Sequence, residues 1–392
     1  MHVLLAFDKF KDSLTAPVAC ELTAAALRER HPDWTLDLCP LADGGEGFCE
    51  ILTHAAGGTV ETHVVTGPRG APTPATIGFV PLAHIPAPAR ALLSLDIGHW
   101  SLGIPPTVAV VEMATASGLA LLAPDQRDPW QATTLGTGEL IRLAAARPGV
   151  VAILLGVGGS ATSDLGLGAL AALGLTFHSA SGSPISPPIP AHWPQITRLS
   201  GNVASSPSLP PIRIACDVTN PLLGPRGAAA TYGPQKGLRP ADLARLDHES
   251  ARLALLLCAH TGRPDSLMDV PGAGAAGGIS FGLLAATDAQ LLPGFDLVSA
   301  WLDLERKLAS ADLVITGEGR FDDTSLTGKG PGAVAARALA LGKPVHVFAG
   351  AVSTLAPRDQ LTLHAITPPG TPLPDALRGA ESFLTAGVLA AF

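Results

Sequence analysis

The feature that most constrains the fold is the alternation of short apolar runs with an amphipathic segment at the start of the chain. The apolar run "HVLLAF" (2–7) is followed, after a loop, by residues 15–31, where Val18 and Leu22 fall on one helical face. The next segment, "WTLDLCPL" (34–41), has the composition of a second strand. The sequence therefore predicts a β-α-β unit at this end of the chain.

The predicted helix has signals at both ends. Thr15 has a side chain that can cap a helix N-terminus, and Pro17 suits the first helical turn. Arg28, Arg30 and His31 lie near the other end, where positive side chains interact favourably with the helix dipole. We therefore expect the helix to begin next to Thr15 and to end near His31.

The C-terminal part of the chain repeats the alternation. Strands are expected at 311–319, 344–352 and 361–367, and helices at 331–341, between the last two strands and from about Pro374. Strands that alternate with helices imply a parallel sheet. Because each end alone is too small to bury both faces of a sheet, we expect the two ends to join in one flavodoxin-like or Rossmann-like domain.

This reasoning divides the 392 residues into two α/β domains. The discontinuous domain is expected at 1–65 plus 285–392, and a second α/β domain is inserted at 66–284. Inside the insertion, strands are expected at 107–114, 150–158 and 211–218. The proline-rich stretches 67–89 and 179–194 are predicted to be edge hairpins, long loops or domain crossings, because proline cannot donate to a β-ladder.

Composition excludes several classes of function. The formal net charge is −8 with 25 Lys and Arg, which argues against a nucleic-acid partner, because such binding depends on many cationic side chains. The five cysteines are an odd number without a C-x-x-C pair, so we expect reduced thiols in a cytoplasmic protein. The first apolar run is too short for a secretory signal, and later apolar runs are too short to cross a membrane.

Several well-known site motifs are absent or incomplete. "SLTGKGP" lacks the upstream glycine and the hydroxyl of a P-loop, and "GGSAT" lacks the last glycine of a nucleophile elbow. Gly272, Gly274 and Gly277 satisfy G-x-G-x-x-G, but no strand is predicted before them, as a dinucleotide site requires. We therefore interpret this stretch as a backbone-rich anion loop.

Polar loops follow several of the predicted strands. The segment "LGVGGSATSDLGLG" leads from a strand into a helix, so its N–H groups with Ser160, Thr162 and Ser163 can hold phosphates, or simply form a capped turn. The loop after the first strand contains Asp8, Lys9, Lys11 and Ser13, at the edge where open parallel sheets bind ligands. Two lysines there suit a carboxylate or a phosphate, and the alternative is a solvated charged loop.

Two further segments combine charges with loop residues. "ITGEGRFDDTSLTGKGP" (315–331) contains Glu318 and Arg320, so it offers both metal-binding acids and a phosphate-binding base, with structural ion pairing as the alternative. "CDVTNP" ends a strand with Asp217 and Asn220, which can bind a polyol or Mg²⁺ or can form an Asx turn.

The loop "ADGGEG" (42–47) places Asp43 and Glu46 among glycines. If the two carboxylates shared a pocket at about 5 Å with an effective dielectric near 20, they would repel by roughly 3 kcal/mol. A bound cation or a nearby lysine would offset this repulsion. The alternative is a tight turn in which the two acids point apart into water.

Long segments spread over nearly the whole chain resemble the bacterial glycerate kinase family of glyoxylate and sugar-acid metabolism. They are "FDKFKDSLTA", "ADGGEG", "VVEMATASGLALL", "TTLGTGEL", "GVGGSATSDLGLGAL", "CDVTNPLLGPRGAAATYGPQKG", "GAGAAGGISFGL" and "ITGEGRFDDTSLTGKGP". The resemblance implies a two-domain α/β enzyme that uses ATP and Mg²⁺ to phosphorylate D-glycerate in a cleft between its domains. It favours the 2-hydroxyl, with 3-phosphorylation as the alternative.

Phosphoryl transfer needs positioning and charge neutralisation, and we hypothesise site residues on that basis. Catalytic roles fall to Asp43 as general base, with Lys9 and Arg320. The expected substrate-binding residues are Asp8, Lys11, Ser13, Asp217 and Asn220. The expected nucleotide-phosphate residues are Gly158, Gly159, Ser160, Thr162, Ser163, Gly272, Gly274 and Gly277. The expected metal ligands are Glu46 and Glu318.

Two other classes of function stay open at the level of the sequence. One is a hydroxy-acid oxidoreductase, suggested by the G-x-G-x-x-G pattern, and the other is a non-catalytic protein that binds carboxylates. Binding of a nicotinamide cofactor would favour the first, and failure to transfer phosphate would favour the second. A homo-oligomer is compatible with this sequence, as is a monomer.

Overall fold

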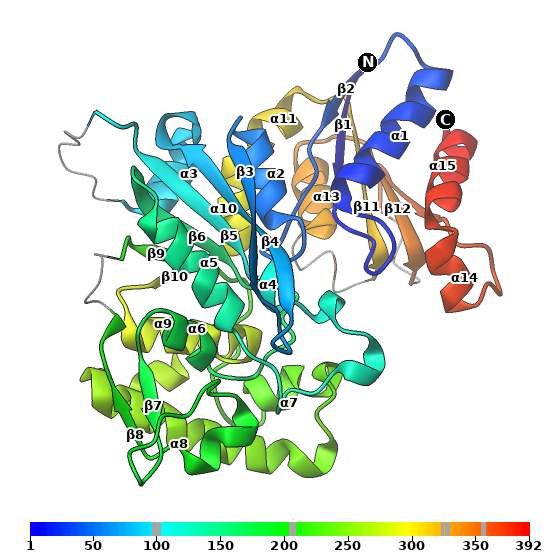
Figure 1. Ribbon diagram of the computed structural model, residues 1–392. Coiled ribbons are helices and arrows are strands. Elements are labelled where there is room, and N and C mark those ends of the chain that lie inside the picture. Colours follow the sequence, from blue (N-terminus) through cyan, green and yellow to red (C-terminus); the bar gives the residue numbers. More distant parts are fainter. Residues whose placement is uncertain (96–102, 204–208, 323–324, 326–329, 354–357) are drawn as a thin grey trace. The chain divides into compact units, whose positions relative to one another are not determined.

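The computed structural model describes residues 1–95, 103–203, 209–322, 325, 330–353 and 358–392. The chain divides into two compact units, which can be followed by colour in Figure 1. Unit 1 consists of residues 1–43 and 298–392, and unit 2 consists of residues 44–297. Each unit has a β-sheet of its own.

The described part of unit 1 contains a five-stranded sheet in the order β13-β12-β11-β1-β2, and every neighbouring pair is parallel. The strands are β1 (His2–Phe7), β2 (Thr35–Leu38), β11 (Leu313–Phe321), β12 (Val345–Val352) and β13 (Leu361–Ala365). Counted within the unit, this is the strand order 2-1-3-4-5 of flavodoxin-like folds. The predicted α/β fold class, with a parallel sheet built from both chain ends, is confirmed.

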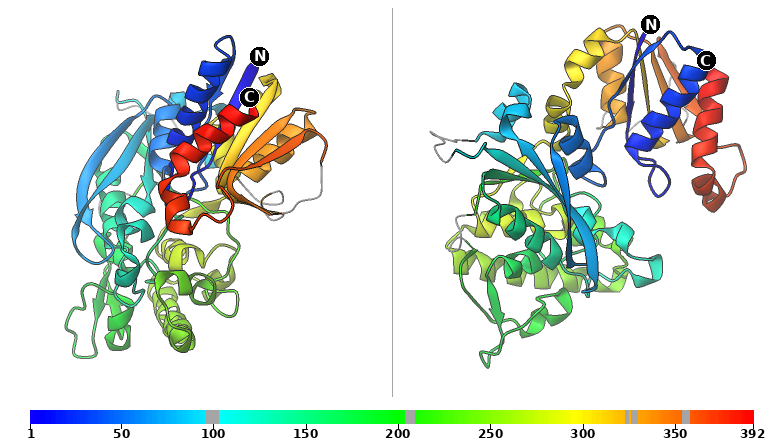
Figure 2. Two further views of the ribbon diagram at one scale, coloured as in Figure 1. Left: turned by 90° about the vertical axis from the view of Figure 1, so that its right-hand side faces the viewer. Right: turned by 45° about the horizontal axis from the view of Figure 1, so that its top comes forward.

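Helices cover both faces of this sheet. α1 (Ala16–Arg30) packs on β1 and β2 and contacts α15 (Ala380–Ala391), which packs on β12 and is preceded by α14 (Leu373–Arg378). Figure 2 shows α1 and α15 side by side, in blue and red. α11 (Leu304–Ser310) and α13 (Pro331–Ala340) contact β1 and each other.

The local signals at the start of α1 behave as predicted. The Thr15 side chain accepts a hydrogen bond from the Val18 backbone N–H at 3.4 Å, and Pro17 lies in the first turn. Val3, Leu5 and Phe7 alternate along β1 and share one buried core with residues of α1 and α15. The alternation therefore fixes which face of β1 the two helices cover.

The larger sheet of unit 2 has the order β10-β9-β6-β5-β4-β3. Its strands are β3 (Thr59–Thr66), β4 (Pro72–Pro81), β5 (Thr107–Glu112), β6 (Val150–Gly156), β9 (Ile212–Ala215) and β10 (Gln290–Leu292). The pairs from β5 to β10 are parallel, and β4 is antiparallel to both β3 and β5. The strands β7 (Thr176–His178) and β8 (Arg198–Ser200) form a separate two-stranded sheet.

Helices pack against the larger sheet, with α2 on β3 to β5 and α5 on β3 to β6. The helices of unit 2 are α2 (Phe48–Ala55), α3 (Ala87–Leu93), α4 (Met113–Ser117), α5 (Leu135–Ala146), α6 (Leu167–Ala172), α7 (Ala228–Tyr232), α8 (Leu243–Thr261) and α9 (Ile279–Ala286). A further helix, α10 (Gly294–Trp301), contains the boundary between residues 297 and 298. The strands expected in the insertion are present as β5, β6 and β9, with ends shortened where loops begin.

The first proline-rich stretch forms an edge hairpin, one of the predicted outcomes. β3 is the edge strand, and Pro72 and Pro74 of β4 pair only with β3, at Thr66 and Val64. The part of β4 that pairs with β5 begins at Ile77. The missing N–H groups of both prolines therefore interrupt no bond to the sheet interior.

The two boundaries between the units differ from the predicted ones. Residues 44–65 were expected in the discontinuous domain, but α2 packs on β4 and β5, and β3 pairs with β4 along its whole length. Residues 285–297 were also expected there, but β10 pairs with β9. The contacts of α2 with β5 and of β10 with β9, which join segments distant in the sequence, thus place both segments in unit 2.

Some predicted features fall outside the described residues. The short helix expected before β13 falls on residues 354–357, and parts of the 315–331 segment fall on 323–324 and 326–329. Within the described residues, no helix combines the length and apolar character needed to span a membrane.

Candidate active site

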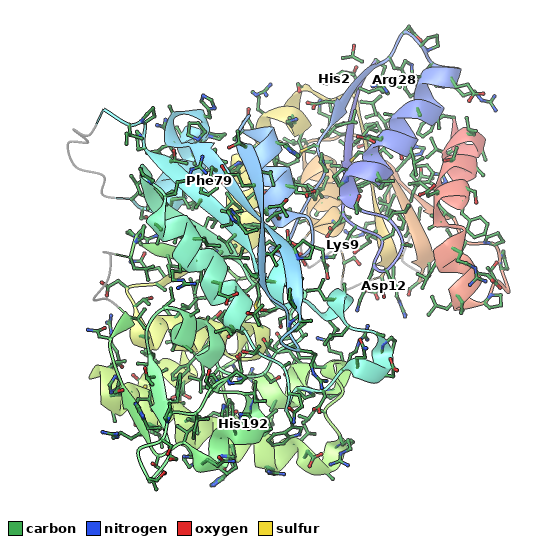
Figure 3. The ribbon with its side chains drawn as sticks, viewed as in Figure 1. His2, Lys9, Asp12, Arg28, Phe79 and His192 are labelled. Carbon is green, nitrogen blue, oxygen red and sulfur yellow. The ribbon has the colours of Figure 1, made fainter. Side chains whose placement is uncertain are left out.

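The loop after β1 lies where the strand order of unit 1 reverses. β1 is flanked by β2 and β11, so this is the switch point at which parallel sheets of this type bind ligands. The Asp8 N–H donates to the Gly317 carbonyl of β11 at 3.0 Å, which joins the two carboxyl ends. Figure 3 shows Lys9 and Asp12 in this loop, at the opposite end of β1 from His2.

Three carboxyl groups meet at this edge, and we call Asp8, Asp43 and Glu318 the acidic edge. Burial raises the pKa of Asp8 to about 7, and the Asp43 carboxylate adds to the rise, while Lys9 opposes it. The Lys9 ammonium lies 3.6 Å from Asp43 Oδ1, and its backbone N–H donates to Asp8 Oδ1 at 2.7 Å. Lys9 therefore offsets part of the repulsion between Asp8 and Asp43.

Glu318 is the least compensated member of the acidic edge. Burial raises its pKa to about 7, and neighbouring carboxylates, including Asp43, add to this against a hydrogen bond from Ser325. Its Oε1 atom is buried and has no hydrogen-bond partner among the described residues. A buried polar atom without a hydrogen bond destabilises the folded protein unless a ligand, a proton or a cation interacts with it.

Chemically, the acidic edge can accept a proton or hold a cation. Asp43 is the most accessible of its members, with 46% of its side chain exposed. No group of three or more His, Cys, Asp or Glu side chains arranged to hold a metal occurs in the described part of the chain. A cation bound here would therefore take most of its ligands from substrate or water, which is usual for Mg²⁺.

The other residues predicted in unit 1 are less enclosed. Lys11 is exposed. The Ser13 hydroxyl donates to the Phe10 carbonyl at 3.0 Å and so closes the turn of its own loop. The Arg320 side chain is 72% exposed and lies 3.6 Å from Asp322, as in the ion-pairing alternative.

The "ADGGEG" loop contains the boundary between the units, because Asp43 ends the first segment of unit 1 and Gly44 begins unit 2. In unit 2, the Gly158 N–H donates to the Gly44 carbonyl at 2.9 Å. A Cβ atom on Gly158 would lie 2.6 Å from Gly45 Cα, and one on Gly159 would lie 2.7 Å from Glu46 Oε1. The glycines therefore allow two backbone loops to touch, and the Glu46 carboxylate lies against the second loop.

The loop Val157–Asp164, which we call the glycine-serine loop, is buried along most of its length. The Lys236 ammonium donates to Ser160 Oγ at 2.8 Å and to the Thr162 carbonyl at 2.6 Å. The hydroxyls of Thr162 and Ser163 are buried and have no hydrogen-bond partner among the described residues. The loop therefore contains buried hydroxyl groups that make no hydrogen bond to the described residues.

The end of this loop is fixed by Asp164. Its carboxylate accepts hydrogen bonds from the N–H and the hydroxyl of Thr134, both at 2.8 Å, and from the N–H groups of Gly166 and Gly168, both at 3.2 Å. Burial raises the pKa of Asp164, and these bonds oppose the rise. Because the N–H groups at the start of α6 already have this acceptor, a phosphate would have to bind the loop and not the helix terminus.

The second glycine loop, residues 272–278, packs against the first. A Cβ atom on Gly277 would lie 2.0 Å from the Thr162 carbonyl oxygen, and one on Gly274 would lie 2.2 Å from the Pro221 carbonyl oxygen. Gly272 and Gly277 also have left-handed backbone angles, with φ of +93° and +75°. A 3₁₀ turn, Asp265–Asp269, precedes this loop where a dinucleotide site would need a strand.

Asp217 and Asn220 already have protein partners. Asp217 Oδ2 accepts from the Phe295 N–H at 2.8 Å, at the start of α10. The Asn220 amide donates to the Arg226 carbonyl at 2.7 Å, and its oxygen accepts from the Tyr232 hydroxyl at 2.7 Å. Both side chains therefore hold loops of unit 2 in place, which is a structural role.

The sequence-based prediction missed Lys236, Asp164 and Thr134 as a connected set. Lys236 lies in "GPQKGL" and is 1% exposed, which is rare for a lysine. The only signal in the sequence was its position between a proline and a glycine. No sequence pattern places it against Ser160, because the two residues lie on loops far apart in the chain.

Comparisons with known proteins agree with this picture. A family model described as "Glycerate kinase family" matches residues 3–388. Glycerate kinase of Bacillus subtilis (strain 168) is 37% identical over 392 residues, 98% of this chain and 95% of that protein. Glycerate 2-kinase of Escherichia coli (strain K12) is 37% identical over 359 residues, 90% of this chain and 86% of that protein.

A solved structure matches as well. The crystal structure of a protein described as glycerate kinase 2 from Salmonella typhimurium LT2 is 37% identical, with a TM-score of 0.72, and the match covers 100% of this chain and 97% of that one. The parallel α/β fold, the polar loops at its strand ends and these relatives define the class, phosphotransferases that act on a hydroxyl group. The chain belongs to the glycerate kinase family.

Proposed function

We propose that this enzyme uses ATP to phosphorylate D-glycerate on its 2-hydroxyl, which gives 2-phospho-D-glycerate and ADP. Membership of the glycerate kinase family supports the acceptor, and the relative named glycerate 2-kinase supports the position. The observation that best supports the site is the acidic edge, where two carboxyl groups at the switch point have pKa values raised to about 7. Groups with such values exchange protons readily at neutral pH.

Asp43 is the proposed general base for the hydroxyl proton. It is the most accessible carboxyl group of the acidic edge, so an incoming hydroxyl can reach it. Lys9 lies 3.6 Å from it and places a positive charge where the transferred group gains negative charge. Lys11, Ser13 and Asp8, on the same loop, complete the proposed contacts to glycerate.

The proposed metal is Mg²⁺, and the acidic edge is compatible with it. A cation would relieve both the mutual repulsion of the carboxyl groups and the buried oxygen of Glu318 that has no hydrogen-bond partner among the described residues. Glu318 and Glu46 are the proposed protein ligands. When bound, Mg²⁺ neutralises charge on the nucleotide phosphates during transfer.

The proposed nucleotide-phosphate residues lie in the two packed glycine loops of unit 2. The unused hydroxyls of Thr162 and Ser163 support a polar ligand at the glycine-serine loop. Ser160 and the glycines at 158, 159, 272, 274 and 277 are proposed to bind a phosphate through the polar groups of these two loops. Arg320 of unit 1, exposed and weakly paired, is proposed to stabilise charge on the transferred group. Asp217 and Asn220 stay in the proposal as substrate-binding residues that also hold the loop after β9 in place.

The location proposed for the enzyme is the cytoplasm, and its five cysteines are all free thiols in the structure, as a reducing compartment requires.

The deciding experiment measures ADP release by a coupled assay with D-glycerate, ATP and Mg²⁺, followed by NMR of the product. We expect ADP only when glycerate and Mg²⁺ are both present, and phosphate on the 2-hydroxyl. L-Glycerate and lactate serve as acceptor controls. Absence of ADP with every hydroxy acid tested would refute the function, and a 3-phosphorylated product would refute the position alone.

The same preparation separates the alternatives. A hydroxy-acid oxidoreductase would bind a nicotinamide cofactor, which is measured by titration of the intrinsic fluorescence. A non-catalytic carboxylate-binding protein would bind glycerate without any ATP turnover.

A further inference from the structure

A charged side chain that the proposed mechanism does not use lies behind the glycine-serine loop. Lys236 belongs to the 3₁₀ turn Pro234–Lys236, and its side chain is among the largest that are fully buried. Burying an ammonium group costs several kcal/mol unless its surroundings compensate it. A fully buried lysine therefore needs a reason.

We propose that Lys236 is a positioning residue, which holds the glycine-serine loop in the conformation that binds a nucleotide phosphate and supplies the positive charge behind it. This inference rests on the proposed function, because it assigns the phosphate to this loop. Lys236 acts through Ser160 and Thr162, and it is not itself proposed to contact the reacting atoms.

The contacts of Lys236 fix two points of the loop. Its ammonium donates to Ser160 Oγ at 2.8 Å and to the Thr162 carbonyl at 2.6 Å. The same Thr162 carbonyl lies so close to Gly277 that a Cβ atom there would be 2.0 Å away. The Thr162 peptide is thus held from one side by Lys236 and from the other by the second glycine loop.

The charge of Lys236 is only partly compensated. Asp164, which is 0% exposed, is the charged group whose field acts on the ammonium within the described residues. That carboxylate is already occupied by bonds from Thr134, Gly166 and Gly168. Among the described residues, the third N–H of Lys236 has no acceptor. Two hydrogen bonds and the field of Asp164 therefore compensate the charge only in part.

The polar atoms next to this charge are also unused. Thr162 is 0% exposed and Ser163 is 5% exposed, and neither hydroxyl has a partner among the described residues. Such atoms are rare in a folded protein, and a bound ligand is one of the few explanations for several of them together. An anion is the ligand whose chemistry suits hydroxyl donors on a loop that an ammonium group also contacts.

Binding of an anion would change the protonation of Lys236. Burial lowers its pKa to about 7, so at pH 8 the ammonium is mostly deprotonated in the free enzyme. A phosphate placed at the loop favours the charged form, so the pKa rises and a proton is taken up. A lysine with a purely structural role would show no such uptake.

The test compares the wild type with Lys236→Met, using MgAMP-PNP, a nucleotide that is not hydrolysed. We expect Lys236→Met to weaken binding by about tenfold to a hundredfold, since a hydrogen-bonded charge is lost. The KM for ATP should rise by a similar factor while the KM for glycerate stays unchanged. Lys307→Met is the matched control, because it removes a partly buried lysine of unit 1 that pairs with Asp37, and it should leave nucleotide binding unchanged.

The proton uptake is measured by calorimetry at pH 8 in buffers of different ionisation enthalpy. The wild type should take up protons on binding MgAMP-PNP, and Lys236→Met should not. Equal proton uptake in the wild type and Lys236→Met, or equal affinity of the two proteins for MgAMP-PNP, would overturn the inference. Either result would leave the proposed function intact if the wild type still showed kinase activity. A wild type that binds no nucleotide would overturn both.

A measurement on the wild type covers the case in which Lys236→Met does not fold. Lysine residues labelled with ¹³C at Cε are titrated by NMR with and without MgAMP-PNP. One lysine should titrate near pH 7 in the free enzyme and at a higher pH when the nucleotide is bound. A spectrum in which no lysine titrates near 7, or in which that lysine ignores the nucleotide, would refute the proposal.

Discussion

The acidic edge of unit 1 and the glycine-serine loop of unit 2 differ in how far hydrogen bonds and opposite charges compensate their ionisable groups. At the acidic edge, like charges gather at the end of a parallel sheet, and Lys9 compensates them only in part. At the glycine-serine loop, a buried cation and a buried acid each make several hydrogen bonds that fix one backbone conformation. The first region is poised to change its protonation or bind a cation, and the second is built to stay in place.

Substitutions in the two regions should therefore affect different properties of the enzyme. A substitution at the acidic edge removes a charge that the fold does not need, so it should change catalysis more than stability. A substitution in the packed loops disturbs the backbone, so it should change stability first. The predictions below test that separation, beginning with the largest expected effect.

Asp43→Asn should lower kcat by about 10²- to 10⁴-fold, which is the usual contribution of a general base. Removing the carboxylate also relieves the repulsion on Asp8, so the melting temperature should stay the same or rise. Steady-state kinetics and calorimetry measure both quantities. The control is Asp12→Asn in the neighbouring loop after β1, an exposed site with φ of 62° that asparagine tolerates, which should keep near-normal activity. Near-normal turnover in Asp43→Asn would remove Asp43 from its proposed role.

Gly277→Ala should destabilise the enzyme by roughly 2 to 5 kcal/mol, combining a left-handed backbone with an overpacked contact. The new Cβ atom would meet the Thr162 carbonyl at 2.0 Å, and neither backbone can yield easily. Gly262→Ala is the matched control, since its φ is +69° but nothing lies within 4 Å of the added atom. Urea denaturation should show the smaller loss, about 1 to 2 kcal/mol, for Gly262→Ala. Equal losses would mean that the loops are not packed as described.

The sequence was a good guide to the fold wherever the signal was local. The β-α-β unit at the start, the Thr15 cap and the strands at the C-terminus depend on periodicity and capping residues that neighbours in the chain provide. The domain boundaries depended on α2 packing on β5 and on β10 pairing with β9, which are contacts between distant segments that no local pattern contains.

The same limit applies to the candidate site. Asp8, Lys9, Asp43 and Glu318 were predictable because they lie within or after the C-terminal parts of β1, β2 and β11, and the topology makes these parallel strands neighbours. Lys236 was not, because its partners Ser160 and Thr162 lie 76 and 74 positions away in the sequence. The contact of Gly44 and Gly45 with a second loop was not predictable either, because Gly158 lies far from them in the sequence.

The stability of the wild type should fall relative to Glu318→Gln as the pH rises from about 4.5 to about 7. The pKa of Glu318 is raised from 4.5 to about 7 in the folded state, so in this range the folded protein holds a proton that the unfolded chain has lost. Unfolding therefore becomes easier with rising pH, and the effect levels off above 7. Glutamine cannot titrate, so its variant lacks this dependence.

Urea denaturation of both proteins across this pH range measures the difference. Asp375→Asn, at an exposed site in α14, controls for the loss of one charge. A difference between the wild type and Glu318→Gln that does not vary with pH would contradict the raised pKa. Added Mg²⁺ should reduce the difference, because a cation favours the charged form of Glu318.

Thr15→Ala should give the smallest effect, a loss of about 1 kcal/mol or less, as expected for a helix cap. The hydrogen bond to Val18 N is long at 3.4 Å and exposed, which favours the lower part of that range. Thr15→Ser keeps the hydroxyl and should restore most of the stability. Because α1 begins directly after the loop with Lys9 and Asp12, this variant shows whether weakening the fold beside the acidic edge is enough to impair catalysis. We expect unchanged kcat and KM at 25 °C. A large drop in kcat would mean that the kinetic loss in Asp43→Asn cannot be assigned to its missing carboxylate alone.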